Sequence, residues 1–168
     1  MPDFDEYTKV DCRWVLELRG DIWRSRLVCL DYKSDNPDQE GLYTPGSNPK
    51  QGRLFDLYHA KKMRDGFKVV VGDATNAYFH ALQTEKIFCD PPEYIKERWR
   101  KKGIDPKSKM VLDRMLYGQR PASKAYHKVV EELLLSLGFK QFKPNPQFYF
   151  RREDKVLAEV HLDDMRRC

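Results

Sequence analysis

Three acidic residues have the types and positions that metal-assisted chemistry requires. Asp73 directly follows the valine-rich segment 67–72, which reads as a buried central strand, and Asp163 and Asp164 follow a second alternating segment 90 residues later. An unpaired charge at the end of a buried strand is costly, so such carboxylates usually serve a function or cap a turn. If the two strands are neighbours in one sheet, the three carboxylates converge.

A carboxylate cluster without histidine or cysteine ligands suits hard cations such as Mg²⁺ or Mn²⁺. Two such ions, about 3.5–4 Å apart, can activate an attacking hydroxyl and stabilise a leaving oxygen in phosphoryl transfer. In the alternative interpretation, Asp73 caps a turn and Asp163 and Asp164 form the polar end of a strand. The isolated residues leave both interpretations open.

The cysteines and histidines predict no site of their own. The four cysteines are far apart, without a CxxC motif, and no histidine pair has metal-ligand spacing. The acidic N-terminus lacks the apolar core of a signal peptide, so we expect free thiols in a reducing, intracellular compartment, cytoplasmic or nuclear. No apolar run approaches the ~20 residues of a membrane span, so no membrane partner is expected.

Charge is distributed unevenly along the 168 residues. Residues 96–155 contain 16 Lys and Arg against 7 Asp and Glu, whereas the rest of the chain contains 15 against 19. A basic third on a mildly acidic scaffold indicates a polyanionic partner, or else a solvated charged surface. The 9 Phe, 9 Tyr and 3 Trp provide enough apolar area for a core, so global disorder is not expected.

The elements that must position the aspartates form an α+β pattern. Residues 13–18 and 25–30 alternate as a β-hairpin, and the Pro- and Gly-rich segment 31–52 predicts a long loop. A helix is expected over 53–64, short strands over 67–72 and 86–89, and a basic helix near 95–102. Apolar residues recur every three or four positions after Pro121 and predict a helix that ends before Gly138. Residues 147–151 and 155–162 predict two more strands.

Five segments resemble those of copia-type retrotransposon reverse transcriptases, and their order and rough spacing along the chain agree with that family. VVVGDATNAYFHA resembles motif A, and KIFCDPPE resembles the strand and double proline that follow it. MLYGQRPASKAYHKVVEELLLSLGF is similar to the leucine-tyrosine-glycine segment and its helix. NPQFYFRR with VHLDDM resembles the hairpin and motif C, and RWVLELRGDIWRSRLVCL resembles the fingers hairpin. The resemblance covers roughly residues 13–165.

This resemblance implies a partial fingers-palm of a right-hand polymerase, with an antiparallel sheet and packed helices. It implies an N-terminal extension over 1–12, fingers over about 13–65, and a palm over about 66–168 that is truncated at motif C. The implied activity is two-metal, RNA-directed DNA synthesis within a Gag-Pol polyprotein that also carries integrase and RNase H. Its partners would be an RNA template, a DNA primer and a deoxynucleoside triphosphate.

The resemblance also implies roles for individual residues. Asp73 and Asp163 would hold two Mg²⁺ ions (Mn²⁺ being possible), with Asp164 as the third catalytic carboxylate. Tyr78 would lie under the incoming sugar and exclude a 2′-hydroxyl, the alternative being a core tyrosine. The remaining candidates are arginines and a lysine. Arg24 and Arg26 would grip the triphosphate, and Arg120 and Lys124 would contact nucleic acid.

The chain departs from the family pattern at three places. Pro121 stands where motif B usually has glutamine, and His161 stands where motif C has tyrosine. After Asp164 only Met-Arg-Arg-Cys follows, so we expect the second motif C strand to be missing and the aspartates to lie on a frayed end. We therefore expect the isolated chain to be inactive as a polymerase. The alternatives to polymerase activity are an inactive remnant that at most binds nucleic acid non-specifically and a metal-dependent nuclease.

Overall fold

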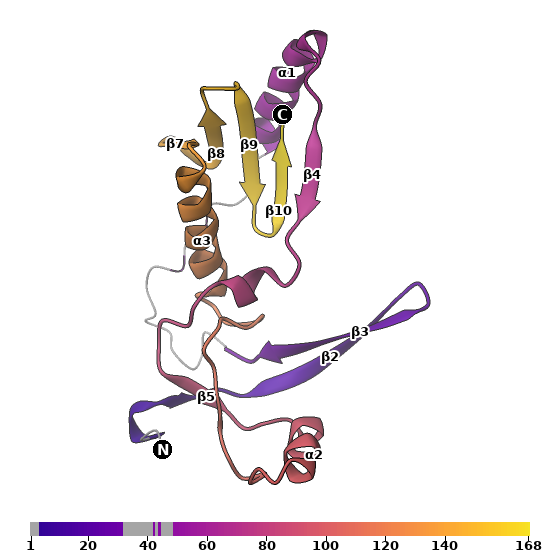
Figure 1. The fold of residues 1–168 in the computed structure, drawn as a ribbon, viewed down its shortest axis with the longest axis vertical. Coiled ribbons are helices and arrows are strands. Elements are labelled where there is room, and N and C mark those ends of the chain that lie inside the picture. Colours follow the sequence, from indigo (N-terminus) through magenta and orange to yellow (C-terminus); the bar gives the residue numbers. More distant parts are fainter. Residues whose placement is uncertain (1–3, 32–41, 43, 45–48) are drawn as a thin grey trace. The chain divides into compact units, whose positions relative to one another are not determined.

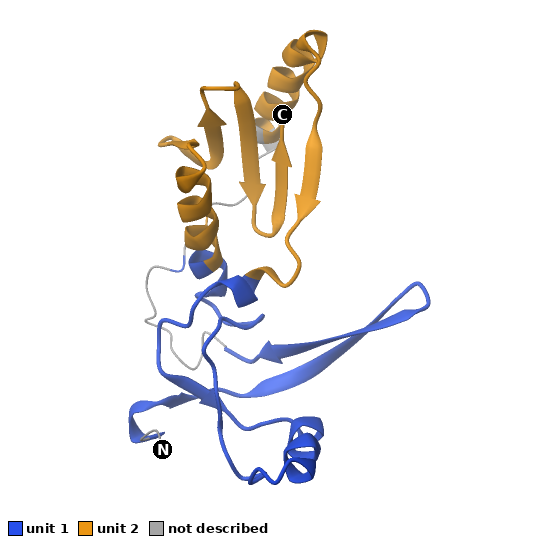
Figure 2. Cartoon of the chain, viewed as in Figure 1, with its two compact units in different colours: residues 1–42, 78–125 blue, residues 43–77, 126–168 orange. Residues whose placement is uncertain are grey.

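The computed structural model describes residues 4–31, 42, 44 and 49–168, and its chain divides into two compact units. Figure 2 colours unit 1, residues 1–42 and 78–125, in blue and unit 2, residues 43–77 and 126–168, in orange. The chain passes from unit 2 to unit 1 between Ala77 and Tyr78. It returns within helix α3 (Ala122–Ser136).

Unit 1 contains the predicted hairpin, formed by β2 (Cys12–Arg19) and β3 (Ile22–Cys29) (Figure 1). The two strands pair antiparallel from Cys12 opposite Cys29 to Arg19 opposite Ile22. Gly20 begins the connecting turn with a φ of 60°, which glycine adopts without steric cost. The hairpin prediction is confirmed, although β2 extends one residue further at each end and β3 begins three residues earlier, at the turn, and ends one residue earlier.

A small sheet forms the rest of unit 1, in the order β1 (Thr8–Lys9), β5 (Ile87–Cys89) and β6 (Met110–Val111). Strands β1 and β5 run parallel, and β6 is antiparallel to β5. Helix α2 (Glu93–Lys101) follows β5 and confirms the expected basic helix. The core of the unit contains cysteines and aliphatic residues from several strands. Its buried members are Cys29, Ile87, Cys89, Leu112 and Leu116.

Gly118 joins two parts of unit 1 at close range. Its φ is 88°, and a Cβ at this position would lie 2.1 Å from the Cys29 carbonyl oxygen. The neighbouring Tyr117 carbonyl accepts the Cys29 N–H at 2.7 Å, and Tyr117 forms a parallel bridge with Val28. Only glycine fits both the backbone conformation and the space, so Gly118 allows residues 117–118 to dock on β3.

Unit 2 is a five-stranded antiparallel sheet in the order β4-β10-β9-β8-β7. The strands are β4 (Val70–Asp73), β7 (Lys140–Phe142), β8 (Asn145–Arg151), β9 (Val156–His161) and β10 (Asp164–Arg167). The α+β pattern expected from the sequence is confirmed to the extent that the chain combines helices with antiparallel strands. The strands of this sheet come from both ends of the unit's sequence, as Figure 1 shows.

Helix α1 (Pro49–Lys62) packs on one face of this sheet through Phe55, which is buried against Phe148 and Leu157. The helix begins four residues earlier than the sequence predicts, inside the segment expected to be a loop. Most of that segment lies outside the described residues. Helix α3 confirms the predicted apolar periodicity, because Tyr126, Val130 and Leu134 are buried at four-residue intervals.

Two strand predictions are wrong. The valine run near Asp73 was expected to be a buried central strand, but β4 is an edge strand, and Val70 and Val71 are 50% and 71% exposed. The strand expected to be missing after Asp164 is present as β10, which pairs with both β4 and β9. The aspartates therefore lie in a paired hairpin rather than on a frayed end.

No helix in the described ranges has the length and apolarity needed to cross a bilayer.

Arg166 connects β10 to its neighbours. Its Nε donates a hydrogen bond to the buried carboxylate of Glu159 on β9, and its Nη1 donates to Asp56 Oδ1 at 3.0 Å. Nη2 donates to the Gly52 carbonyl at 3.1 Å, and the guanidinium lies 4.4 Å from the centre of the Phe55 ring. A buried carboxylate is costly unless it is paired, so Glu159 requires the arginine that β10 supplies.

We expect Arg166→Met to destabilise unit 2 by about 2–4 kcal/mol, because Glu159 would remain buried without a counter-charge. The expected loss is less than for a fully buried pair, since 28% of the Arg166 side chain is exposed. The control is Arg167→Met, on the adjacent, exposed residue, which should change stability by less than about 0.5 kcal/mol. Urea denaturation followed by circular dichroism measures both variants, and equal losses would contradict the role of Arg166.

Candidate carboxylate site and its surroundings

Strands β4 and β10 place two aspartates directly opposite each other. Asp73 pairs with Asp164, and the Ala74 N–H donates to the Asp163 carbonyl at 2.9 Å. This hydrogen bond brackets Asp73 and Asp164 as a non-hydrogen-bonded pair, in which Cα atoms are about 4.5 Å apart and side chains are closest. Both carboxylates therefore leave the same face of the sheet, and both residues are exposed.

Asp163 lies in the tight turn between β9 and β10. His161 pairs with Asp164, so Leu162 and Asp163 are the two central residues of the turn. The bond from the Ala74 N–H to the Asp163 carbonyl fastens this turn to the chain that leaves β4. Asp73 and the adjacent pair Asp163 and Asp164 thus come from two distant segments to one end of the sheet, because β4 and β10 are neighbours.

The turn itself is strained. Leu162 has a φ of 54°, whereas Asp163 is not in the left-handed region. Glycine usually occupies the first central position of a two-residue turn of this kind, and a bulky residue with positive φ is uncommon. The strain amounts to about 1–3 kcal/mol. It coincides with the position of the acidic residues, and such strain is often found at functional sites.

The residues present fit a divalent cation through a pair of carboxylates. No described lysine, arginine or histidine forms an ion pair with Asp73, Asp163 or Asp164. Within the described residues, no three acidic, histidine or cysteine side chains are gathered into a complete ligand set. Mg²⁺ is commonly bound by one or two carboxylates, with waters and substrate phosphates completing its shell, so two facing carboxylates match its requirements.

In unit 1, two of the other predicted residues, Tyr78 and Arg26, both contact the ring of Tyr117. The Tyr78 and Tyr117 rings lie 4.7 Å apart at 50°, and the Arg26 guanidinium is 5.6 Å from the centre of the Tyr117 ring. The Phe79 ring contacts Tyr117 edge-on at 5.8 Å. Tyr117 was not among the residues predicted from the sequence. The only available signal was its place in the leucine-tyrosine-glycine segment.

The hairpin of unit 1 has two chemically different faces, because side chains alternate along each strand. Arg24 and Arg26 leave the same face, where Arg24 lies opposite Glu17 and Arg26 lies opposite Val15. The other arginines of this face are Arg13 and Arg19. The opposite face is mostly apolar and consists of Cys12, Trp14, Leu16, Leu18, Trp23, Ser25, Leu27 and Cys29. Of the two predicted phosphate ligands, Arg26 is the one that contacts Tyr117.

The predicted nucleic-acid contacts Arg120 and Lys124 lie around the start of helix α3. The Arg120 N–H donates to Asp31 Oδ2 at 2.9 Å, which ties this segment to the end of the hairpin. Lys124 is exposed on the first turn of the helix. Gln119, near the expected motif B glutamine, is buried, and its Oε1 accepts the Leu116 N–H at 2.6 Å. Its side chain therefore stabilises a turn.

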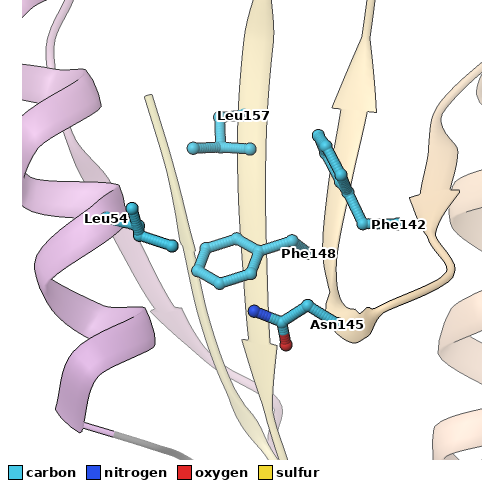
Figure 3. Close-up of a pocket in the computed structure, with 5 residues that line it drawn as sticks. All are labelled: Leu54, Phe142, Asn145, Phe148 and Leu157. Carbon is cyan, nitrogen blue, oxygen red and sulfur yellow. The ribbon is translucent and has the colours of Figure 1, made fainter.

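Unit 2 also contains a cavity of about 180 Å³, whose lining does not include the three aspartates. Figure 3 shows Leu54 of helix α1 and Phe148 and Leu157 of the sheet around it, with Phe142 and Asn145 completing the lining. The lining has one polar side chain and no charged one. It is an apolar gap between helix and sheet, without the ionic groups needed to hold a phosphate or a metal ion.

Comparison with known proteins identifies no family: no family model, curated protein or solved structure matches this chain.

The strained turn makes a testable prediction about Leu162. We expect Leu162→Gly to be more stable than Leu162→Ala by about 1 kcal/mol, because both lose the side chain but only glycine relieves the positive φ. Urea denaturation measures the difference, and amide hydrogen exchange at Ala74 reports whether the turn stays attached to β4. An alanine variant as stable as the glycine variant would show that the turn is not strained.

Proposed function

We propose that this chain is a fingers-and-palm segment of a copia-type reverse transcriptase and that its carboxylate site serves RNA-directed DNA synthesis. The observation that carries the proposal is the facing pair of Asp73 and Asp164, with Asp163 in the adjoining turn. These are the aspartates of the segments that resemble motifs A and C. Their convergence is required by the resemblance and is not implied by their separation of 90 residues in the sequence.

The sheet around the site supports the same proposal. The motif C hairpin is complete, because β10 pairs with β9 on one side and with the motif A strand β4 on the other. Neighbouring pairing of these two segments gives the backbone register that holds their carboxylates together. With Mg²⁺ bound, the site would supply Lewis-acid stabilisation of phosphate oxygens and of the attacking hydroxyl.

Each chain residue then has a definite task. Asp73 and Asp163 would hold the cations together with Asp164, the third carboxylate, which lies directly across from Asp73. Tyr78, packed on Tyr117, would present a fixed ring that leaves no room for a 2′-hydroxyl on an incoming sugar. Arg24 and Arg26 would bind phosphate oxygens, a task suited to the planar guanidinium group.

A second function, non-specific nucleic-acid binding without catalysis, is favoured by the arginine-rich face of the hairpin. Arg13, Arg19, Arg24 and Arg26 share that face with a single carboxylate, Glu17, with which Arg19 forms an ion pair at 3.0 Å. A row of exposed arginines can neutralise successive phosphates of a nucleic-acid backbone and release their counterions. This surface adds to the basic stretch 96–155 and does not depend on the carboxylates.

The facing aspartates predict an opposite response of stability with and without metal. In EDTA, we expect Asp164→Asn to be more stable than the unsubstituted chain by about 0.5 kcal/mol, because like charges directly opposite repel. Added Mg²⁺ or Mn²⁺ should stabilise the unsubstituted chain by binding the folded state, and Asp164→Asn should gain much less. Thermal denaturation measures both effects.

The control for this experiment is Glu97→Gln, which removes one exposed carboxylate from helix α2 in the other unit. It should respond to metal as the unsubstituted chain does. Equal stabilisation of Asp164→Asn and the unsubstituted chain by metal would contradict the proposed cation site.

Primer extension on an RNA template tests the activity. We expect extension with Mg²⁺ or Mn²⁺ and a loss of at least about 100-fold with Asp73→Asn, since removing one electrostatic contact to a transition state commonly costs that much. Product analysis separates extension from cleavage by a nuclease. Binding that weakens steeply with salt, without extension, would select the second function. Failure of both would contradict the assignment.

A further inference from the structure

Three of the four cysteines, which are scattered in the sequence, meet in the core of unit 1. Cys29 and Cys89 are buried, and Cys12 is half-buried and packs against the same cluster. The Cys12 thiol forms hydrogen bonds with those of both Cys29 and Cys89. The fourth cysteine, Cys168, is buried in unit 2 and belongs to a different core cluster. The thiols of Cys29 and Cys89 thus both lie beside that of Cys12. This cysteine cluster is in unit 1, whereas the carboxylates are in unit 2.

The backbone places two of these sulfurs at disulfide-forming distance. Cys12 and Cys29 are opposite each other in the β2–β3 register, and the Leu30 N–H donates to the Asp11 carbonyl at 2.7 Å. This bond brackets Cys12 and Cys29 as a non-hydrogen-bonded pair, with Cα atoms about 4.5 Å apart. Disulfides span Cα separations of about 4.4–6.8 Å, so the two sulfurs can be joined with little backbone movement.

Cys89 reaches the same place from a different strand. Pairing between β1 and β5 continues beyond β1, because the Val10 N–H donates to the Phe88 carbonyl at 2.9 Å. The end of β5 therefore lies beside the chain that enters β2 at Cys12. Cys89 is fully buried, and its thiol is the second hydrogen-bond partner of Cys12. It can replace Cys29 as a partner but is not aligned with Cys12 in a strand register.

Cys12 differs from its partners in access and in acidity. It is more exposed than Cys29 and Cys89, so a small oxidant reaches it first. Hydrogen bonds from the other two thiols stabilise its thiolate and lower the pKa of Cys12, whereas the same contacts together with burial raise the pKa of Cys29 and of Cys89. Since the thiolate is the nucleophile, Cys12 is the reactive cysteine, and Cys29 and Cys89 are the candidate resolving cysteines.

We propose that Cys12, Cys29 and Cys89 form a hydroperoxide-sensitive site in which oxidised Cys12 is resolved as a disulfide with Cys29. The Cys12 thiolate attacks one peroxide oxygen, so an S–O bond forms, the O–O bond breaks and hydroxide leaves. The sulfur of Cys29 then attacks the sulfenic sulfur after losing its proton. The S–S bond forms, the S–O bond breaks and water leaves. Two thiols are oxidised, and one hydrogen peroxide is reduced to two waters.

The disulfide would join β2 to β3 at the end of the hairpin that lies away from the Gly20 turn. Cys29 is also the residue on which residues 117–118 dock, since its N–H bonds to the Tyr117 carbonyl and its carbonyl faces Gly118. Oxidation would therefore link β2 covalently to the strand that supports Tyr117. The site lies in unit 1, whereas the carboxylates lie in unit 2, so the proposal does not depend on the proposed polymerase activity.

Peptide mapping of the full chain tests the proposal. The reduced chain is treated with hydrogen peroxide, its remaining thiols are alkylated under denaturing conditions, and tryptic peptides are analysed by mass spectrometry. We expect residues 10–13 and 27–33 to appear as one cross-linked species that has lost two hydrogen atoms, in monomeric protein. Cys168 should remain alkylated, which digestion after glutamate shows in residues 160–168.

Variants distinguish the roles of the three thiols. Cys12→Ser should slow intramolecular disulfide formation by roughly tenfold or more, because the reactive thiolate is lost. Cys29→Ser should divert the cross-link to Cys89, whereas Cys89→Ser and the control Cys168→Ser should leave the Cys12–Cys29 disulfide unchanged. Because the mapping of the unsubstituted chain is decisive by itself, a variant that fails to fold does not remove the test.

Any of three outcomes would overturn the proposal. The first is an unsubstituted chain with all four cysteines still alkylated after peroxide. The second is a disulfide that joins two molecules or involves Cys168. The third is an oxidised chain in which Cys12 is joined to Cys89 rather than to Cys29.

Discussion

The carboxylate end of unit 2 depends on one interaction, the pairing of buried Glu159 with Arg166. Glu159 lies on a central strand and would be costly to bury alone. Arg166 meets it from the next strand and continues to Asp56 and the Gly52 carbonyl on helix α1. Strand β10 is only four residues long. It is held in the sheet by the contacts of Arg166 and by its pairing with β4 and β9. Two residues before Arg166, and on the same face, stands Asp164.

Two local costs lie at that end of the sheet. Asp73 and Asp164 face each other as like charges, and Leu162 occupies a backbone conformation that favours glycine. Lys155, in the turn between β8 and β9, has a similar φ of 58°, so positive φ is not confined to the aspartate end. Between helix α1 and the sheet, the unit packs aromatic and aliphatic side chains. The repulsion between the facing aspartates is the local cost that a bound cation would relieve under the proposed function.

The sequence predicted elements well where a period was long and clear. The hairpin and helix α3 followed from alternation and from apolar spacing of three and four residues. It failed for β4, because a valine run indicates strand formation but not whether the strand lies at the centre or the edge of a sheet. It failed for β10, because Asp164–Arg167 is polar and short, and its strand conformation comes from pairing with β4 and β9. Residue types also suggested a cation site before any geometry was known.

What the sequence determined by itself is therefore local: the two-faced hairpin, the apolar stripe of α3, and the presence of three aspartates at strand ends. These follow from periods of two and 3.6 residues, which neighbouring residues encode directly. The tertiary structure decided which distant residues meet, namely Asp73 with Asp164 and Cys12 with Cys29 and Cys89. Strand order and register decide such meetings, and they arise from contacts between segments that no local period records.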